Sequence, residues 1–334
     1  MSDNILEIRD LYTSFRSETD GSVTNVLNGV SFSVPRGSIL GVVGESGSGK
    51  SVTMLTVMRL LGKNADVSGN IFFNGQDLLQ LSEEEMRKIR GGRISMIFQD
   101  PMTALNPVYT VGNQLREMIR LHRPDIKDVN AYAAELLETV GISDGEKRLK
   151  QYPHELSGGM RQRVVIAMAL SSEPEILIAD EPTTALDVTV QAQIIDLIKD
   201  LTKKRRMTTI LITHDLGVVA GVCDSVVVLY AGRICEKGTA REIFKDPHHQ
   251  YTKGLIAAVP GAVPGKRLVP IEGTPVNLKA MPKGCAFFPR CTKAMEICRD
   301  ELPPDRTFSE THSACCWMNE LPEGFDPFAK EEEK

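Results

Sequence analysis

The stretch GESGSGKS, residues 44–51, decides the fold of this 334-residue chain. It follows the apolar run SILGVVG (38–44) and precedes the helix-like SVTMLTVMRLL (51–61). It matches G-x-x-x-x-G-K-[ST], in which glycines let backbone N–H groups curve around phosphate oxygens and the lysine reaches the β and γ phosphates. The last hydroxyl then takes a Mg²⁺ position. An ordinary glycine-rich turn could carry these letters, but the strand before and the helix after favour a nucleotide site.

A pair of carboxylates follows a second apolar run. ILIADEP (176–182) places Asp180 and Glu181 at the carboxyl end of a strand, which is where ligands of parallel sheets bind. Asp180 can hold Mg²⁺ through water, and Glu181 could take a proton from water that attacks the γ-phosphorus. A solvated acidic strand end is the alternative for this pair taken alone. The phosphate loop makes that alternative unfavourable.

A second glycine-rich helix start lies about a hundred residues after the first. ELSGGMRQRVVIAMAL (155–170) has Ser157 in a capping position, two glycines and an apolar stripe at helical spacing. The free N–H groups and positive dipole of such a helix start suit a phosphate. The chain therefore predicts two phosphate-binding helix starts.

The pattern of apolar runs predicts an α/β fold. The five runs expected as buried strands of a largely parallel sheet are 38–44, 93–99, 176–180, 208–214 and 224–230. Most are followed by a helix-like segment. Alternating segments at 5–15, 28–34 and 69–73 predict an antiparallel β unit before the core.

The rest of the sequence predicts a helical subdomain and a loop-rich C-terminal extension beside this core. Residues 105–172 hold helical patterns with no strand-like run, and prolines and glycines multiply from residue 259 onward. We expect the loop-rich end to have little regular structure and the final AKEEEK to be disordered. The expected divisions are a core of 4–104 and 173–258, a helical subdomain of 105–172, a Cys-rich extension of 259–320 and a tail of 321–334.

Composition narrows the class of protein. A formal charge of −5 and a pI near 5.8 argue against nucleic acid as the main partner. No run approaches the ~18 apolar residues of a membrane span, and the first residues do not read as a secretory signal. We expect a cytosolic chain that docks on a membrane protein. Seven cysteines, five of them within 285–316, favour a metal or cluster site over a disulfide framework.

The order of the motifs resembles the ATP-binding-cassette family over residues 4 to about 255. GESGSGKS, LSGGMRQ, ILIADE, TTALD (183–187) and ITHD (212–215) follow one another at near-fixed separations. The resemblance implies two ATPase domains packed head to tail, so that the LSGGQ-type helix of one covers ATP on the other. Ser157, Gly158 and Gly159 would then contact a partner's γ-phosphate. Met160 replaces a common glutamine, a harmless change because backbone N–H groups and Ser157 do the binding.

The resemblance assigns the other site residues one at a time. Gln99, in FQDPMTALNP, matches the glutamine that senses Mg²⁺ and the attacking water, with a surface turn residue as the alternative. His214 matches the histidine that contacts the γ-phosphate, although a lone histidine at a strand end is more often structural. Asp187 matches the conformational loop between the two sites, and Mg²⁺ would be held through Ser51, Gln99 and Asp180. Phe15 matches the aromatic that stacks on adenine, although Tyr12 is three residues away and an aromatic at a β-edge is usually part of the core. The other expected ATP-binding residues are Gly44, Ser46, Gly47, Ser48, Gly49, Lys50, Ser51 and Val52.

Four stretches narrow the resemblance to the ATPase subunits of bacterial oligopeptide and dipeptide importers. They are FQDPMTALNP, IADEPTTALDVTVQAQI, YAGRICEKG and HQYTKGLIAAVP, in which Gln250 stands where typical members have proline. The resemblance implies a heterodimer with a second, paralogous ATPase, two transmembrane permeases and an extracytoplasmic peptide-binding protein. The chain would lie peripherally on the cytoplasmic face of the membrane. An ATPase of a nickel or other importer, a soluble cassette ATPase and a phosphate-loop kinase are the alternatives.

Cysteines of the extension suggest a metal group. Cys285, Cys291, Cys298 and Cys315 are spaced C-x5-C-x6-C-x16-C, which leaves zinc and iron–sulfur ligation open. Free structural cysteines are the alternative. The resemblance implies a [4Fe–4S] cluster, because importer ATPases of this class carry such a tail and some bind a cluster there. Cys316 is adjacent to Cys315 and could replace it as the fourth ligand.

Overall fold

Two β-sheets organise the chain in the computed structural model, which describes residues 3–100, 104–184, 186–259 and 270–322. The first is a four-stranded antiparallel sheet in the order β2-β1-β4-β5. Its strands are β1 (Asn4–Arg16), β2 (Val23–Pro35), β4 (Ala65–Phe73) and β5 (Gln76–Asp77). The antiparallel β unit predicted from alternation is confirmed, with β1 and β2 longer than the segments that predicted them.

The second sheet is the core of the α/β fold. It has eight strands in the order β11-β12-β10-β9-β3-β8-β7-β6, and β9, β3, β8, β7 and β6 run parallel. These five strands occupy the five predicted apolar runs. The strands are β3 (Ile39–Val43), β6 (Ile94–Ile97), β7 (Ile176–Asp180), β8 (Thr208–Thr213), β9 (Ser225–Tyr230), β10 (Arg233–Thr239), β11 (Asp305–Thr307) and β12 (Ser313–Cys315).

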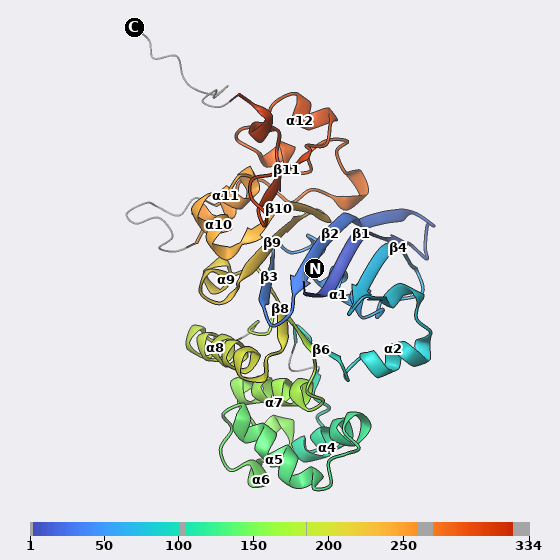
Figure 1. Cartoon of the computed structure of the whole chain (residues 1–334), viewed down its shortest axis with the longest axis vertical. Helices are drawn as coiled ribbons and strands as arrows, with labels where there is room; N and C mark the ends of the chain where they lie inside the picture. The colour runs from blue at the N-terminus through green and yellow to red at the C-terminus, as the bar shows by residue number, and fades with distance from the viewer. Residues whose placement is uncertain (1–2, 101–103, 185, 260–269, 323–334) are drawn as a thin grey trace.

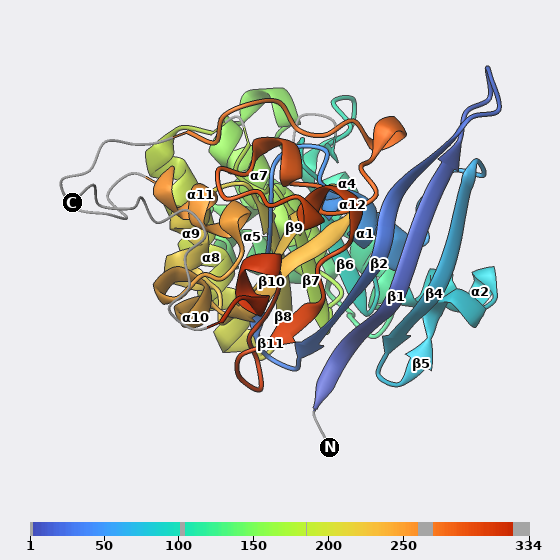
Figure 2. The ribbon, with the colours of Figure 1, turned by 90° about the horizontal axis from the view of Figure 1, so that it is seen from above.

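Alternate residues of the core strands pack into two separate apolar cores. Leu177 and Ala179 of β7 face a core that includes the helices, whereas Ile176 and Ile178 face a core shared with the antiparallel sheet. Figure 2 shows this layering, with β1, β2 and β4 on one side of the core strands and α8 to α11 on the other. Burial on both faces explains why these strands read as continuous apolar runs.

Helices cover the core sheet and form one end of the molecule. In Figure 1 helices α4 to α7 gather at the lower end, whereas α12 lies at the upper end. The described residues of 105–172 contain helices and no strand, as their pattern predicts. The helices are α1 (Lys50–Val57), α2 (Glu83–Ile89), α4 (Val111–His122), α5 (Val129–Thr139), α6 (Gly145–Arg148), α7 (Gly158–Leu170), α8 (Val188–Arg205), α9 (Leu216–Val222), α10 (Ala240–Lys245), α11 (Gln250–Ala257) and α12 (Ile297–Asp300). Short 3₁₀ turns are η1 (Leu78–Gln80), η2 (Pro153–Glu155), η3 (Leu278–Ala280), η4 (Phe288–Arg290) and η5 (Trp317–Glu320).

The C-terminal extension is joined to the core sheet, which the loop-rich sequence did not predict. Strand β12 pairs antiparallel with β10, so that Ala314 lies opposite Glu236, and β11 adds the edge strand. Each of the two strands has three residues, and all three residues of β11 are exposed, so neither carries a periodic signal. The predicted disorder of AKEEEK lies outside the described residues.

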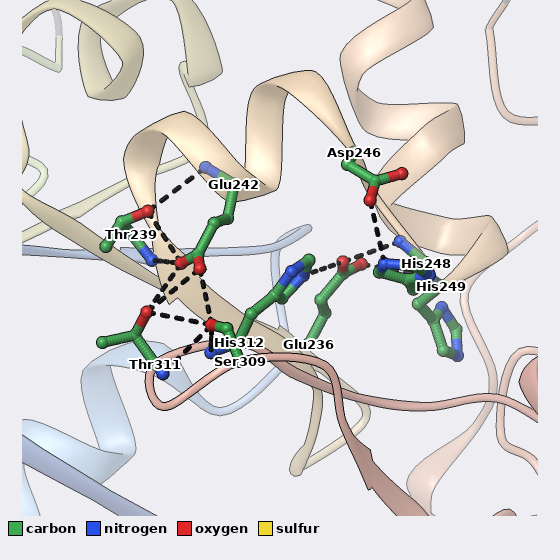
Figure 3. A network of polar contacts seen from close by, with 9 residues as sticks. All are labelled: Glu236, Thr239, Glu242, Asp246, His248, His249, Ser309, Thr311 and His312. Carbon is green, nitrogen blue, oxygen red and sulfur yellow. Dashed lines mark hydrogen bonds and ion pairs between the residues drawn. The ribbon is translucent and has the colours of Figure 1, made fainter.

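Two carboxylates of the core anchor the extension (Figure 3). Glu236 is fully buried and accepts hydrogen bonds from His312 Nε2 (2.8 Å) and from the backbone N–H groups of His248 (2.7 Å) and His249 (2.9 Å). On the next helix, Glu242 accepts from the hydroxyls of Ser309 (2.6 Å) and Thr311 (2.8 Å). Burial raises the pKa of Glu242, but the hydroxyl donors outweigh it and hold this pKa at about 2.

Candidate functional site

The phosphate loop connects β3 to the first turn of α1. Lys50 is buried, and its Nζ donates to the carbonyl oxygens of Gly44 (2.8 Å) and Glu45 (2.9 Å). Burial lowers the pKa of Lys50, while the carboxylates of Glu181, Asp180 and Glu45 act in the opposite direction. Glycine is required at position 44, where φ is +151° and a Cβ atom would lie 2.1 Å from the carbonyl oxygen of Leu229. The loop therefore closes around a lysine ammonium.

Oxygen donors suited to Mg²⁺ meet beside this loop. Ser51 Oγ, in the first turn of α1, donates a 2.9 Å hydrogen bond to Oδ1 of Asp180 at the end of β7. Burial raises the pKa of Asp180, and the Ser51 hydrogen bond and the charge of Lys50 oppose the rise. A hydroxyl and a carboxylate oxygen are hard ligands of the kind that Mg²⁺ prefers. The pair fits the predicted metal position.

Glu181 is the point where the predicted catalytic residues converge. Its Oε2 accepts hydrogen bonds from Gln99 Nε2 (2.8 Å) and from Thr184 Oγ1 (3.1 Å). Its Oε1 lies 3.4 Å from Nδ1 of His214. The side chain of Glu181 is 15% exposed, whereas that of His214 is 67% exposed. The structure thus brings together three residues that the sequence places in three different motifs.

The backbone of Glu181 is held in an unusual conformation. Its φ is +45°, in the left-handed region that costs a glutamate on the order of 1 kcal/mol. Its N–H donates to the carbonyl oxygen of Ile212 at 2.9 Å, which ties this turn to the neighbouring strand β8. The turn redirects the chain directly after β7, so that the Glu181 side chain faces Gln99 and His214.

The second glycine-rich helix start is α7, which lies in a different part of the molecule from α1 (Figure 1). Ser157 is its N-cap, and its Oγ accepts from the N–H of Met160 at 3.3 Å. A Cβ atom on Gly159 would lie 2.7 Å from Cγ1 of Val190, so this helix start is packed closely against α8. In the described parts of the chain, no hydrogen bond joins residues 157–159 to the phosphate loop.

The other predicted residues lie at the margins of this site. Phe15 is half-buried on β1 and pairs with Thr24 and Ala65, whereas Tyr12 is exposed and lies beside Gly29. Asp187 caps α8 and accepts from the N–H of Val190 at 2.9 Å. The rest of the phosphate loop is arranged as follows: Val52 packs against the core shared with the antiparallel sheet, Gly49 caps α1 with φ of +101°, and Ser46, Gly47 and Ser48 line a cavity with the extension.

Three polar residues of the site were not predicted from the sequence. Thr184 supplies a hydrogen bond to Glu181, and Glu45 of the phosphate loop forms an ion pair with Arg290 of the extension. Thr184 lies in the motif TTALD (183–187), three residues after Glu181, so its place in the sequence could have indicated the contact. Arg290 offered no such signal, because it is 245 residues away from its partner.

The cysteines of the extension line two cavities, and Cys285 lines both of them. Cys285, Cys291, Cys298 and Cys316 line a cavity of about 10 Å³. Cys315, the predicted fourth ligand, lines a different cavity of about 430 Å³. Cys315 is the last residue of β12 and Cys316 follows it with an extended backbone, so the two side chains point to opposite sides. The structure therefore places Cys316 with the first three cysteines.

Some features of these four cysteines fit an iron–sulfur cluster and others do not. Four thiols are the donor set of a [4Fe–4S] cluster, with one thiolate on each iron. Burial raises the pKa of Cys291 to about 11 and that of Cys285 to about 12, so these thiols are protonated unless a metal binds. The cavity has room for about one water molecule. Among the described residues, no group of three or more His, Cys, Asp or Glu side chains is placed to hold a metal ion.

No helix within the described ranges is both long enough and apolar enough to cross a membrane.

Comparisons with known proteins agree with this geometry. A family model described as ABC transporter matches residues 27–184, and one described as Oligopeptide/dipeptide transporter, C-terminal region matches residues 235–298. The dipeptide transport ATP-binding protein DppD of Bacillus subtilis is 50% identical, over 95% of this chain and 96% of its own length. The oligopeptide transport ATP-binding protein OppD of Escherichia coli is also 50% identical, over 95% of this chain and 94% of its own.

A solved structure shows the same fold. It is a dimeric, post-hydrolysis state of the ATP-binding cassette MJ0796 bound to ADP and Pi, with a TM-score of 0.62 and 25% identity. It covers 71% of this chain, which in turn covers 99% of it. With relatives this similar over nearly its whole length, and with a phosphate loop, the Ser51–Asp180 pair and a convergent glutamate in one place, the chain belongs to the ABC transporter family as one of its ATPases.

Proposed function

We propose that this chain is the ATP-hydrolysing subunit of an importer of oligopeptides or dipeptides. The observation that carries the catalytic part is the convergence of Gln99, Thr184 and His214 on Glu181, next to the Ser51–Asp180 pair. The peptide substrate is supported by the names of the relatives and by the match of the extension to the oligopeptide/dipeptide region. The same names make a nickel importer the less favoured reading.

The side chains divide the chemistry among themselves. Lys50 and the backbone N–H groups of the loop hold the β and γ phosphates of ATP. Mg²⁺, held by Ser51 and Asp180 with Gln99 nearby, would neutralise charge on the phosphate oxygens. Glu181 takes the proton of the attacking water, and Gln99 and Thr184 orient its carboxylate. His214, which lies beside the other carboxylate oxygen of Glu181, contacts the γ-phosphate.

The active form in this proposal is a head-to-tail pair of ATPases. Ser157, Gly158 and Gly159 lie in a different part of the molecule from the phosphate loop, so they are available for ATP bound by a partner, and Asp187 lies between the two sites. We infer a heterodimer with a paralogous ATPase. Two transmembrane permeases and an extracytoplasmic binding protein complete the importer, with this chain lying peripherally on the cytoplasmic face.

The proposed divisions assign these tasks to parts of the chain. The core of 4–104 and 173–258 binds ATP, the helical part of 105–172 presents Ser157 to the partner, and the extension of 259–320 carries the cysteines. We propose that the extension binds a [4Fe–4S] cluster through Cys285, Cys291, Cys298 and Cys316. The four thiols that line one cavity support this donor set.

Reconstitution tests the proposed function. The chain, its partner ATPase and the two permeases would be placed in vesicles with the binding protein, and uptake of a labelled dipeptide, a labelled pentapeptide and ⁶³Ni²⁺ would be measured. We expect ATP-dependent uptake of a peptide and none of nickel. ATP-dependent nickel uptake without peptide uptake would refute the substrate class, and active ATP hydrolysis with neither would refute the importer.

A further inference from the structure

The extension reaches the phosphate loop through an ion pair whose arginine is buried. The guanidinium of Arg290 binds both carboxylate oxygens of Glu45, with Nη1–Oε2 at 2.6 Å and Nη2–Oε1 at 2.9 Å. The side chain of Arg290 is 5% exposed and that of Glu45 is 25% exposed. Two parallel charge-assisted hydrogen bonds fix both distance and orientation. Glu45 is the second residue of GESGSGKS, so the contact is made to the loop itself.

Arg290 is held in place on the side of the extension. Its Nε donates to the carbonyl oxygen of Glu272 at 2.9 Å, and its Nη2 also approaches that of Ile271 at 3.4 Å. A further contact at 3.3 Å joins Nη1 to the hydroxyl of Tyr230 at the end of β9. The guanidinium is therefore fixed before it meets Glu45, and little side-chain entropy is lost in the contact.

Glu45, which binds Arg290 through its side chain, also contacts the lysine of the loop through its backbone. Its N–H donates to the hydroxyl of Tyr251 at 2.8 Å, and Tyr251 is fully buried. The carbonyl oxygen of Glu45 accepts from Lys50 Nζ at 2.9 Å. One residue thus connects the extension, helix α11 and the ammonium that is placed to meet the phosphates.

A second surface of the extension lies along the same loop. Pro275, Val276 and Leu278 line a cavity of about 140 Å³ together with residues 45–48. The extension therefore contacts the phosphate loop at both a charged and an apolar position.

We propose that Arg290 is a positioning residue for nucleotide binding, which acts by neutralising and orienting Glu45. ATP is strongly anionic, and an unpaired carboxylate in the loop that binds it would repel the triphosphate. Because the guanidinium cancels that charge and fixes the loop, nucleotide binding depends on a residue of the C-terminal extension. Arg290 is also the residue directly before Cys291, so the fold of the cysteine region determines where the guanidinium lies.

The test is a set of variants in the assembled transporter, with KM for ATP and kcat measured separately. Arg290→Met keeps an unbranched apolar stem and removes the charged guanidinium, and we expect KM for ATP to rise about tenfold with kcat within about twofold. Arg290→Lys keeps the charge but loses the two parallel hydrogen bonds of the guanidinium, so its KM should lie between that of the wild type and that of Arg290→Met. Arg299→Met is the matched control, because this exposed arginine follows Cys298 in the same extension.

A rescue separates positioning from a structural effect. In the variant that carries both Glu45→Gln and Arg290→Met, no carboxylate is left to repel ATP, and we expect KM to return to within about threefold of the wild type. An unchanged KM in Arg290→Met, an equal rise in Arg299→Met, or a double variant as weak as Arg290→Met alone would each overturn the proposal. Thermal unfolding of each variant checks that it is folded.

Discussion

Gln99 Nε2 donates a 2.8 Å hydrogen bond to Oε2 of Glu181, across 82 residues of chain. The contact follows from the parallel sheet, because β6 and β7 are neighbours and Ile97 lies opposite Ala179. Residues just beyond the carboxyl ends of two neighbouring parallel strands meet at the same edge. The glutamine therefore holds one carboxylate oxygen of Glu181 and leaves the other facing His214.

Removal of this hydrogen bond should slow the chemical step more than it weakens binding. We expect Gln99→Ala to lower kcat about 10- to 100-fold in the assembled transporter, with the Kd for ATP within about threefold of the wild type. Thr184→Val, which removes the longer 3.1 Å bond to the same oxygen, should lower kcat less. Wild-type turnover in Gln99→Ala would show that the glutamine does not orient Glu181.

Asp180 should determine how much Mg²⁺ the enzyme needs. Asp180→Asn removes the charge that pairs with the metal, so we expect the Mg²⁺ concentration for half-maximal ATPase activity to rise at least about tenfold. The measurement is a Mg²⁺ titration at saturating ATP. Asp196→Asn, an exposed carboxylate on α8, is the control and should leave the titration unchanged. An unchanged Mg²⁺ requirement in Asp180→Asn would remove this residue from the metal site.

Acid should destabilise the protein through His249. This histidine is buried, burial lowers its pKa from 6.5 to about 4, and its Nδ1 accepts a hydrogen bond from the N–H of Tyr251 at 3.0 Å. Between these two pKa values the unfolded chain binds the proton and the folded chain does not. The stability is therefore complete above pH 6.5 and falls as the pH drops toward 4, by up to about 3 kcal/mol.

The matched variant is His249→Asn, since asparagine also caps a helix but does not titrate. We expect its free energy of unfolding, from urea titrations between pH 7 and pH 4.5, to depend less on pH than that of the wild type. Parallel pH profiles for the two proteins would exclude His249 as the titrating group.

Iron content distinguishes the two adjacent cysteines. Cys316 shares a cavity with Cys285, Cys291 and Cys298, whereas Cys315 shares a different cavity with Cys285 but not with Cys291 or Cys298. Anaerobically purified wild type should carry about four irons per chain, Cys315→Ser should keep them, and Cys316→Ser should lose most of them. The opposite pattern would restore Cys315 as the fourth ligand. Stoichiometric zinc without iron would rule out the cluster altogether.

The sequence predicted the parallel core well, because β3, β7 and β8 are buried on both faces and therefore appear as unbroken apolar runs. The family resemblance assigned Gln99 and His214 to the same site as Glu181, and the structure brings these three side chains together, while their catalytic roles stay predictions. The sequence could not predict how the extension joins the core. Strands of three residues, such as β11 and β12, are too short for a periodic pattern.

The sequence also could not predict side-chain contacts between residues that are far apart along the chain. Glu45 and Arg290 are 245 residues apart, and no sequence pattern links them. Their contact depends on how the extension folds back over the phosphate loop. The choice between Cys315 and Cys316 could not be made from the sequence for a different reason. Their spacing from Cys298 differs by one residue, but that one residue reverses the direction of the side chain.

The most direct test of the central claim is ATP hydrolysis by Glu181→Gln in the assembled transporter, measured together with ATP binding. The substitution removes the proton acceptor and keeps the shape of the side chain, while Lys50, Ser51 and Asp180 stay in place. We predict that turnover falls at least about 100-fold while the Kd for ATP stays within about threefold of the wild type. Turnover at the wild-type rate would contradict the account, because Glu181 would then not be the base on which this site converges.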